Sequence, residues 1–183
     1  DPRRQRQMCI RDRFKSEVRS EIDTPMLQKV LPSGTILKDV WWESFGDRIR
    51  KPEHVMNLKY RNESCHGSPG VTFGRQIGAY PILVGVQYQI PLETKSNVMI
   101  TGHGSRSVTA VEVGLDPAKV TENQLASIPG IGRKNAWALI SARAKATSKG
   151  KPIHTHQEMF EAADIVPPAM ALDVFENHST GSQ

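Results

Sequence analysis

The chain has 183 residues, of which 38% are hydrophobic and 23% are charged, and its formal net charge is +5. This length suffices for one domain or two small ones, and the composition excludes a wholly disordered chain. Because no run approaches about eighteen consecutive apolar residues, we expect neither a membrane-spanning helix nor a membrane partner.

Residues 3–13 read RRQRQMCIRDR and hold five arginines, a pattern typical of a basic arm that binds nucleic acid. The same segment resembles the translation of a transposase-type sequencing adapter at every position. We therefore expect residues 1–13 to be disordered and without function, and we leave them out of the fold. An adapter joined to an open reading frame implies a read that began within a gene, so we expect a C-terminal fragment. Cys65 is then the remaining cysteine, which favours a reducing, cytoplasmic location.

Residues 14–33 predict a linking helix. Apolar residues recur at every fourth position from Phe14 to Val30, the spacing that places them on one face of a helix. The tripeptide Asp23-Thr24-Pro25 is typical of a helix start, so the segment is one helix or two short ones.

Residues 34–116 predict a small antiparallel β-barrel of OB-like type. Segments rich in β-forming residues alternate there with Gly, Pro and Asn, which mark the turns. A polar stretch at residues 46–70 predicts a long loop. The adjacent Trp41 and Trp42 must point to opposite faces of their strand, so one of them faces the core. The predicted strands are residues 34–44, 71–76, 80–90, 96–103 and 106–113.

Residues 117–183 predict an all-helical module, which makes the fold class α+β. Two helices are expected on either side of Pro129-Gly130, and a capping box of Thr155 and Glu158 begins a third. Residues 167–178 predict a last short helix. Charge divides the module, because residues 117–151 carry seven basic and one acidic side chains whereas residues 152–183 carry five acidic and no basic ones.

The stretch LASIPGIGRKNAWALI, residues 125–140, closely matches a helix-hairpin-helix motif, with the small residue Ala136 where the helices cross. Glycines allow a tight turn and a close approach of the backbone to a phosphate. The first amides of the second helix and its dipole favour an anion. Such a site binds backbone phosphate without reading bases. The predicted nucleic-acid-binding residues are Gly130, Ile131, Gly132, Arg133, Lys134 and Lys145.

Other interpretations of these residues remain open. The motif can be a tight turn that packs against protein, and residues 154–176 can be a degenerate second copy that buttresses the first. Arg75 and Arg106 lie beside glycines, and they are either solvated turn residues or a secondary binding surface continuous with the hairpin. We expect no catalytic residues and no metal site, because Cys65 and scattered histidines lack the spacing of a metal site.

From Phe14 on, the chain resembles the C-terminal region of an archaeal family of radical S-adenosylmethionine proteins. The matching stretches are IDTPMLQKVLPSGTILKDV, TFGRQIGAYPILVG, HGSRSVTAVE and the hairpin motif. The resemblance implies an upstream radical-SAM domain in the same protein, with a 4Fe–4S cluster and S-adenosylmethionine as cofactors. The chain lacks the CxxxCxxC signature that ligates the cluster, so it holds no catalytic site of that kind.

These observations predict the nucleic-acid-binding C-terminal fragment of a radical-SAM enzyme. The expected ligand is the phosphate backbone of RNA or DNA, with RNA favoured. One alternative is a stand-alone, non-enzymatic nucleic-acid-binding protein with a barrel and a hairpin. The other is a protein-interaction module in which the hairpin docks a partner.

Overall fold

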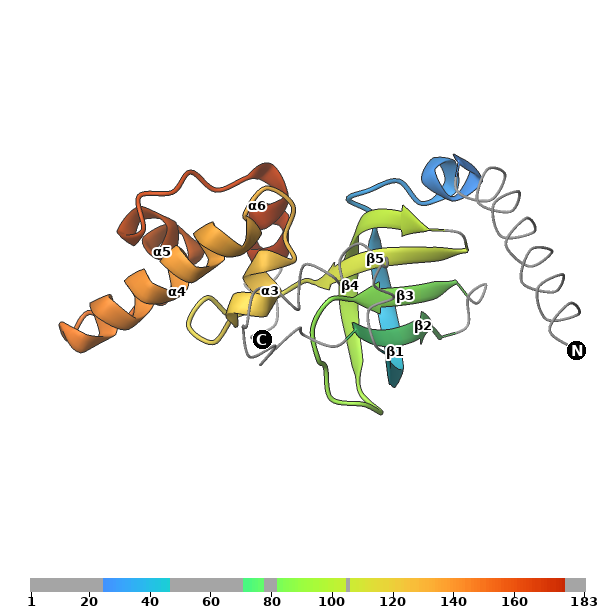
Figure 1. Ribbon diagram of the computed structural model, residues 1–183, viewed down its shortest axis with the longest axis horizontal. Coiled ribbons are helices and arrows are strands. Elements are labelled where there is room, and N and C mark those ends of the chain that lie inside the picture. Colours follow the sequence, from blue (N-terminus) through green and yellow to red (C-terminus); the bar gives the residue numbers. More distant parts are fainter. Residues whose placement is uncertain (1–24, 47–70, 78–81, 105, 177–183) are drawn as a thin grey trace, which may run out of the picture.

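A computed structural model describes residues 25–46, 71–77, 82–104 and 106–176 of the chain (Figure 1). The expectations for residues 1–13, for most of the linking helix and for the loop after residue 46 lie outside these ranges. A helix does begin at Pro25 and ends at Val30. Its first residue is therefore the proline that the sequence places at a helix start.

Five strands form a closed barrel in the order β1-β2-β3-β5-β4. Four of the pairings are antiparallel, whereas β3 and β5 are parallel. The prediction of a wholly antiparallel barrel was therefore wrong at this pair, because a parallel pair joins strands that no short turn connects. The strands are β1 (Ile36–Gly46), β2 (Val71–Gln76), β3 (Leu83–Val86), β4 (Lys95–Gly104) and β5 (Ser107–Glu112).

The interior of the barrel follows the alternation of the strands. Val40 and Trp42 on β1 are fully buried, while Trp41 between them faces outward and is half-buried. The indole Nε1 of Trp42 donates a hydrogen bond of 2.7 Å to Ser96 Oγ, so the buried ring has no unsatisfied donor. Gly74 lies opposite this pair, and a Cβ there would overlap the Trp41 carbonyl oxygen.

The predicted strand at residues 80–90 is shorter in the structure, where β3 ends at Val86. Tyr88 and Ile90 are nevertheless buried. The Thr72 hydroxyl donates to the Tyr88 carbonyl at 2.7 Å and accepts the Ile90 N–H at 3.0 Å. A buried side chain thus satisfies the backbone that the ladder would otherwise pair, which lets the chain bend after β3.

Tyr88 supplies a test of this core. Burial, and then the charge of Glu112, raise the pKa of its phenol well above the usual 10.0. The unfolded chain releases the proton near pH 10 while the folded chain keeps it, so stability should fall as pH rises above about 10. Absorbance at 295 nm should show one tyrosine, absent from Tyr88→Phe, that ionises only as the protein unfolds. Ionisation near pH 10 without unfolding would contradict its burial.

Four helices follow the barrel and lie at one end of it (Figure 1). The Thr155–Glu158 capping box at the start of α5 is confirmed, and Thr121 and Gln124 form a second one before α3. Barrel and helices share one continuous set of buried residues, and the Gly114 N–H donates to the Val174 carbonyl at 2.8 Å. The helices are α3 (Glu122–Ala126), α4 (Gly132–Ser148), α5 (His156–Ala162) and α6 (Ala169–Glu176).

The fold class is therefore α+β, with a closed five-stranded barrel and a helical module. Within the described ranges, none of the helices has both the length and the apolar character needed to cross a bilayer.

Candidate functional site

The turn between α3 and α4 is built on two glycines with left-handed backbone angles. Gly130 has φ +90° and Gly132 has φ +68°, a region that other residues adopt only with strain. We call residues 129–132 the glycine turn. Ile128 and Ile131 are buried on either side of Gly130, so their side chains fix the turn to the core.

The start of α4 faces solvent and has no side-chain cap. Ile131 occupies the N-cap position without a capping hydrogen bond, although the first amides of a helix have no partner inside it. Gly132, Arg133 and Lys134 are all exposed, and a Cβ on Gly132 would meet nothing within 4 Å. Helix dipole, open amides and two cationic side chains therefore meet at one place, which suits a phosphate group.

Ile131 differs from its predicted role as a contact residue. Its side chain is only 4% exposed, and its N–H donates to the Ile128 carbonyl at 3.2 Å. Ile131 therefore anchors the turn and leaves contact with a ligand to its neighbours.

Gly130 has a structural role on the other side of the turn. A Cβ at this position would lie 2.9 Å from Pro168 Cβ, at the end of the segment that joins α5 to α6. Pro168, in the acidic half of the module, thus lies close to the glycine turn. Its Glu158 is occupied as a helix cap, because the carboxylate accepts the N–H groups of His154 and Thr155, and these bonds lower its pKa.

Lys145 does not lie with the other predicted contact residues. It stands in the last turn of α4, about 16 Å along the helix from Lys134 at 1.5 Å per residue. The eleven-residue separation is close to three full turns, so both lysines point to the same side of α4. Lys145 therefore lies at the far end of α4 from the glycine turn, but on the same side of the helix as Lys134.

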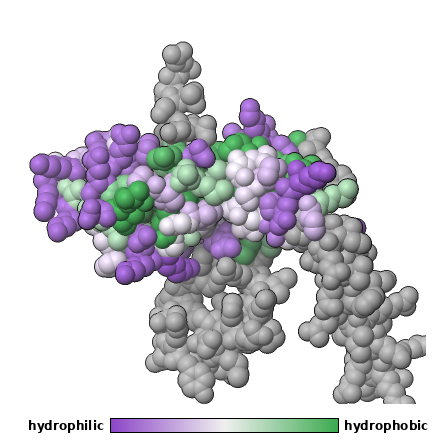
Figure 2. All heavy atoms as spheres, turned by 90° about the horizontal axis from the view of Figure 1, so that it is seen from above, coloured by the Kyte–Doolittle hydropathy of each residue, from purple (hydrophilic) through white to green (hydrophobic). Residues whose placement is uncertain are grey.

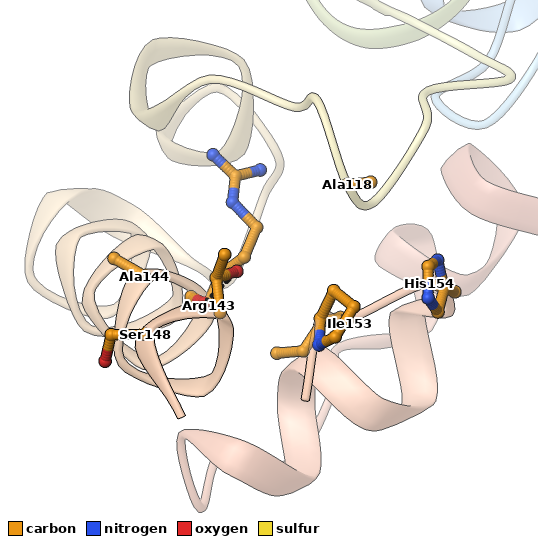
Figure 3. A pocket seen from close by; sticks show the side chains of 8 residues that line it. Ala118, Arg143, Ala144, Ser148, Ile153 and His154 are labelled. Atoms are coloured by element: carbon orange, nitrogen blue, oxygen red, sulfur yellow. Dashed lines mark hydrogen bonds between the residues drawn. The ribbon is translucent and has the colours of Figure 1, made fainter. Parts of the chain in front are cut away.

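Arg143 shows why local charge alone does not identify a site. Its Nη1 donates to the carbonyls of Pro117 at 3.0 Å and Val120 at 2.7 Å. Figure 3 shows the side chain extending towards the segment before α3 and away from Ile153 and His154, with which it lines a hollow beside α4. Arg143 thus ties α4 to the connection from the barrel and does not join the exposed cations.

Arg143→Met should therefore destabilise the fold without changing nucleic-acid binding. It leaves two carbonyl oxygens without their donor, which costs about 1–3 kcal/mol. Urea unfolding measures that cost, and the salt dependence of oligonucleotide binding measured on the folded variant should equal that of wild type. A flatter salt dependence would place Arg143 in the interface.

Arg75 and Arg106 are exposed and lie at one end of the barrel. Arg75 pairs with Leu83, and Leu83 with Ser107, so Arg106 lies about 10 Å from Arg75 across β3. Of the two interpretations left open for these arginines, a surface that continues into the hairpin does not fit this arrangement. Arg106 precedes β5 whereas the helical module follows it, and Figure 1 shows the β4–β5 turn at the far end of the barrel from α3–α6.

Arg75 takes part in a small polar cluster on the outer face of the barrel. Its Nε lies 3.7 Å from Glu43 Oε2, and it lines a shallow depression with Trp41 and Ile77. Arg106 has φ +56°, a left-handed angle that is strained for arginine and marks the tight turn between β4 and β5.

Metal ligands do not gather in the part of the chain that the structure describes, where no three His, Cys, Asp or Glu side chains lie together. Cys65 lies outside that part, as do His54 and His66.

Trp137 was missed as a candidate residue. It is 63% exposed on α4, next to the buried Ala136. The spacing of Ala136, Leu139 and Ile140 assigns the inward face of the helix, and Trp137 falls outside that spacing. That departure is the signal by which the sequence could have identified it. Figure 2 shows hydrophilic residues covering much of the surface at the α4–α5 end of the molecule.

Two archaeal proteins are similar to this chain. It is 35% identical over 122 residues to an uncharacterized protein of Archaeoglobus fulgidus. The aligned region covers 66% of this chain and 19% of that protein. It is also 36% identical over 97 residues to an uncharacterized protein of Methanocaldococcus jannaschii, and this aligned region covers 52% of the chain and 14% of that protein. The chain thus spans less than a fifth of the length of these relatives. No protein-family model and no solved structure matches it.

Proposed function

We propose that this chain binds the phosphate backbone of nucleic acid, with RNA as the expected ligand, through the glycine turn and the first turn of α4. The observation that carries the proposal is the open start of α4. Gly132 is exposed in a left-handed conformation, no side chain caps the helix, and Arg133 and Lys134 follow at once. Backbone amides and the helix dipole favour binding of an anion. The two cationic side chains neutralise phosphates, which releases the counter-ions bound to the nucleic acid and favours binding further.

The two helix pairs support the interpretation of the module as a helix-hairpin-helix with a degenerate second copy. The α3–α4 pair carries the glycines, and the α5–α6 pair carries Pro167-Pro168 in their place. Pro168 lies against Gly130, which is how a second copy would brace the first. The acidic half then supports the site, and the basic half contacts the ligand.

The order of the strands supports an OB-like interpretation of the barrel. Barrels of that kind bind oligonucleotides with the face of strands 2 and 3 and with the loops between strands 1 and 2 and between strands 4 and 5. Arg75 lies on β2 and Arg106 lies in the β4–β5 turn. We therefore keep these two arginines as a second surface, separate from the glycine turn.

In a larger protein these residues would deliver nucleic acid to a radical-SAM domain of the same protein. The proposal draws on the family resemblance and on the length of the relatives, of which this chain spans less than a fifth. The 4Fe–4S cluster would have to be held elsewhere, because the two cysteines of this chain, Cys9 and Cys65, cannot supply its thiolates.

Binding to two labelled RNA oligonucleotides of unrelated sequence tests the proposal. Fluorescence anisotropy at several salt concentrations should give equal affinities and a linear log–log dependence, with a slope of about −0.7 for each neutralised phosphate of a single strand. A protein-interaction module would show no binding that salt can weaken. The native upstream reading frame separates a radical-SAM fragment from a stand-alone protein.

A further inference from the structure

The outward face of α4 carries an exposed tryptophan between two lysines. At 100° per residue, Lys134, Trp137, Ser141 and Lys145 fall within about 80° of one another around the helix, on the side away from the buried Ala136 and Leu139. We call these four residues the α4 stripe. Its lysines are exposed and Trp137 is 63% exposed, whereas Trp42 in the barrel is fully buried.

The charge of α4 limits what can cover this stripe. The helix carries Arg133, Lys134, Arg143 and Lys145 and no acidic residue. An acidic ligand therefore meets attraction along the whole length of the stripe. A flat aromatic ring between cations adds a second requirement, because an exposed indole face stacks favourably on another aromatic ring.

A nucleic-acid strand with unpaired bases meets both requirements. Side chains three residues apart on a helix lie about 5–6 Å from each other, so Trp137 lies within one nucleotide of a phosphate bound near Lys134. The bases of a duplex are stacked on one another and offer no free face to a side chain on the surface. Stacking on tryptophan is therefore available to a single strand and denied to a duplex of the same charge.

We infer that the α4 stripe binds single-stranded nucleic acid, with Trp137 stacking on an unpaired base beside the phosphate at the glycine turn. The inference rests on the proposed function and deepens it, since it assigns the class of ligand. Lys145 then contacts the backbone further along the same strand, which accounts for its distance from the turn.

Two probes test the inference, a short labelled oligouridylate and a blunt-ended RNA duplex of similar length. Trp137→Ala should lower the affinity for the oligouridylate about fivefold or more, and Trp137→Phe should lose less, because stacking on an aromatic ring contributes strongly to each base. Affinity for the duplex should stay within about twofold, since charge is unchanged. Oligouridylate should also quench the part of the tryptophan fluorescence that is absent from Trp137→Phe.

Val166→Ala is the matched control, because Val166 is also exposed, at 89%, and lies off α4. It should leave both affinities unchanged, and the thermal midpoints of all variants should stay close to wild type. Lys134→Glu distinguishes a failure of the single-strand inference from a failure of the proposed phosphate site. If it weakens both probes while Trp137→Ala changes neither, the phosphate site stands and the single-strand inference is wrong. If neither variant changes binding, both are wrong, and the stripe faces a protein partner.

Discussion

Lys134→Glu should weaken binding to every oligonucleotide alike, by about tenfold or more at low salt, and should flatten the log–log salt dependence by about one contact. Lys134 is exposed in the first turn of α4, where the dipole and the uncapped amides already favour an anion. The substitution removes one cation and places a carboxylate at the same point. Since no base is read there, the loss should be independent of sequence.

Lys38→Glu is the matched control for this variant. Lys38 is an exposed residue of β1, and its substitution changes the net charge of the chain by the same amount. If it weakens binding as much as Lys134→Glu does, the effect is one of overall charge and the glycine turn has no special role. Glu158 is unsuitable as a control, because its carboxylate caps α5.

Gly130→Ala should destabilise the chain by about 2–5 kcal/mol, which is the largest stability effect expected at the site. The left-handed angle of φ +90° costs an alanine about 1–2 kcal/mol. Its methyl group would also lie 2.9 Å from Pro168 Cβ, so the α5–α6 connection must move, and overpacking adds about 1–3 kcal/mol. Urea unfolding monitored by circular dichroism measures the free energy.

Gly132→Ala separates strain from packing. Gly132 has φ +68° but open space around it, so alanine there should cost about 1–2 kcal/mol from strain alone. It should also reduce oligonucleotide binding, because the methyl group stands beside the open amides. Equal destabilisation by Gly130→Ala and Gly132→Ala would show that Pro168 does not brace the turn.

Local signals in the sequence predicted most of the helical module. Proline and glycine bound α3 and α4, and capping residues bound α5, since these residues act on the backbone within a few positions. Ala136, expected where the helices cross, is fully buried.

Contacts between distant residues could not be predicted in this way. The packing of Gly130 against Pro168 joins residues far apart in the sequence, and so do the bonds from Arg143 to Pro117 and Val120. Both depend on how the helices meet. Arg143 is one of the seven basic side chains of residues 117–151, and its sequence position alone does not show that it holds α4 in place.

The pairing of the barrel strands could not be predicted from local sequence signals either. Each strand was predicted near its observed position, but the parallel pairing of β3 with β5 depends on closure of the whole sheet. That closure also decides where Arg75 and Arg106 lie. Gly104 marked the turn beside Arg106, whereas Gly74 next to Arg75 lies within β2 opposite Trp42. The separation of this end of the barrel from the helices appears only in three dimensions.

If the open start of α4 holds a phosphate group of a nucleic-acid strand, the backbone amides there should report it through their chemical shifts. A ¹⁵N-labelled sample titrated with oligouridylate should show its largest shifts at the N–H groups of Gly132, Arg133 and Lys134, with smaller ones at Trp137. Addition of salt should reverse them, because the contact is ionic. Unchanged amides at the start of α4, with shifts confined to Arg75 and Arg106 on the barrel, would contradict the account.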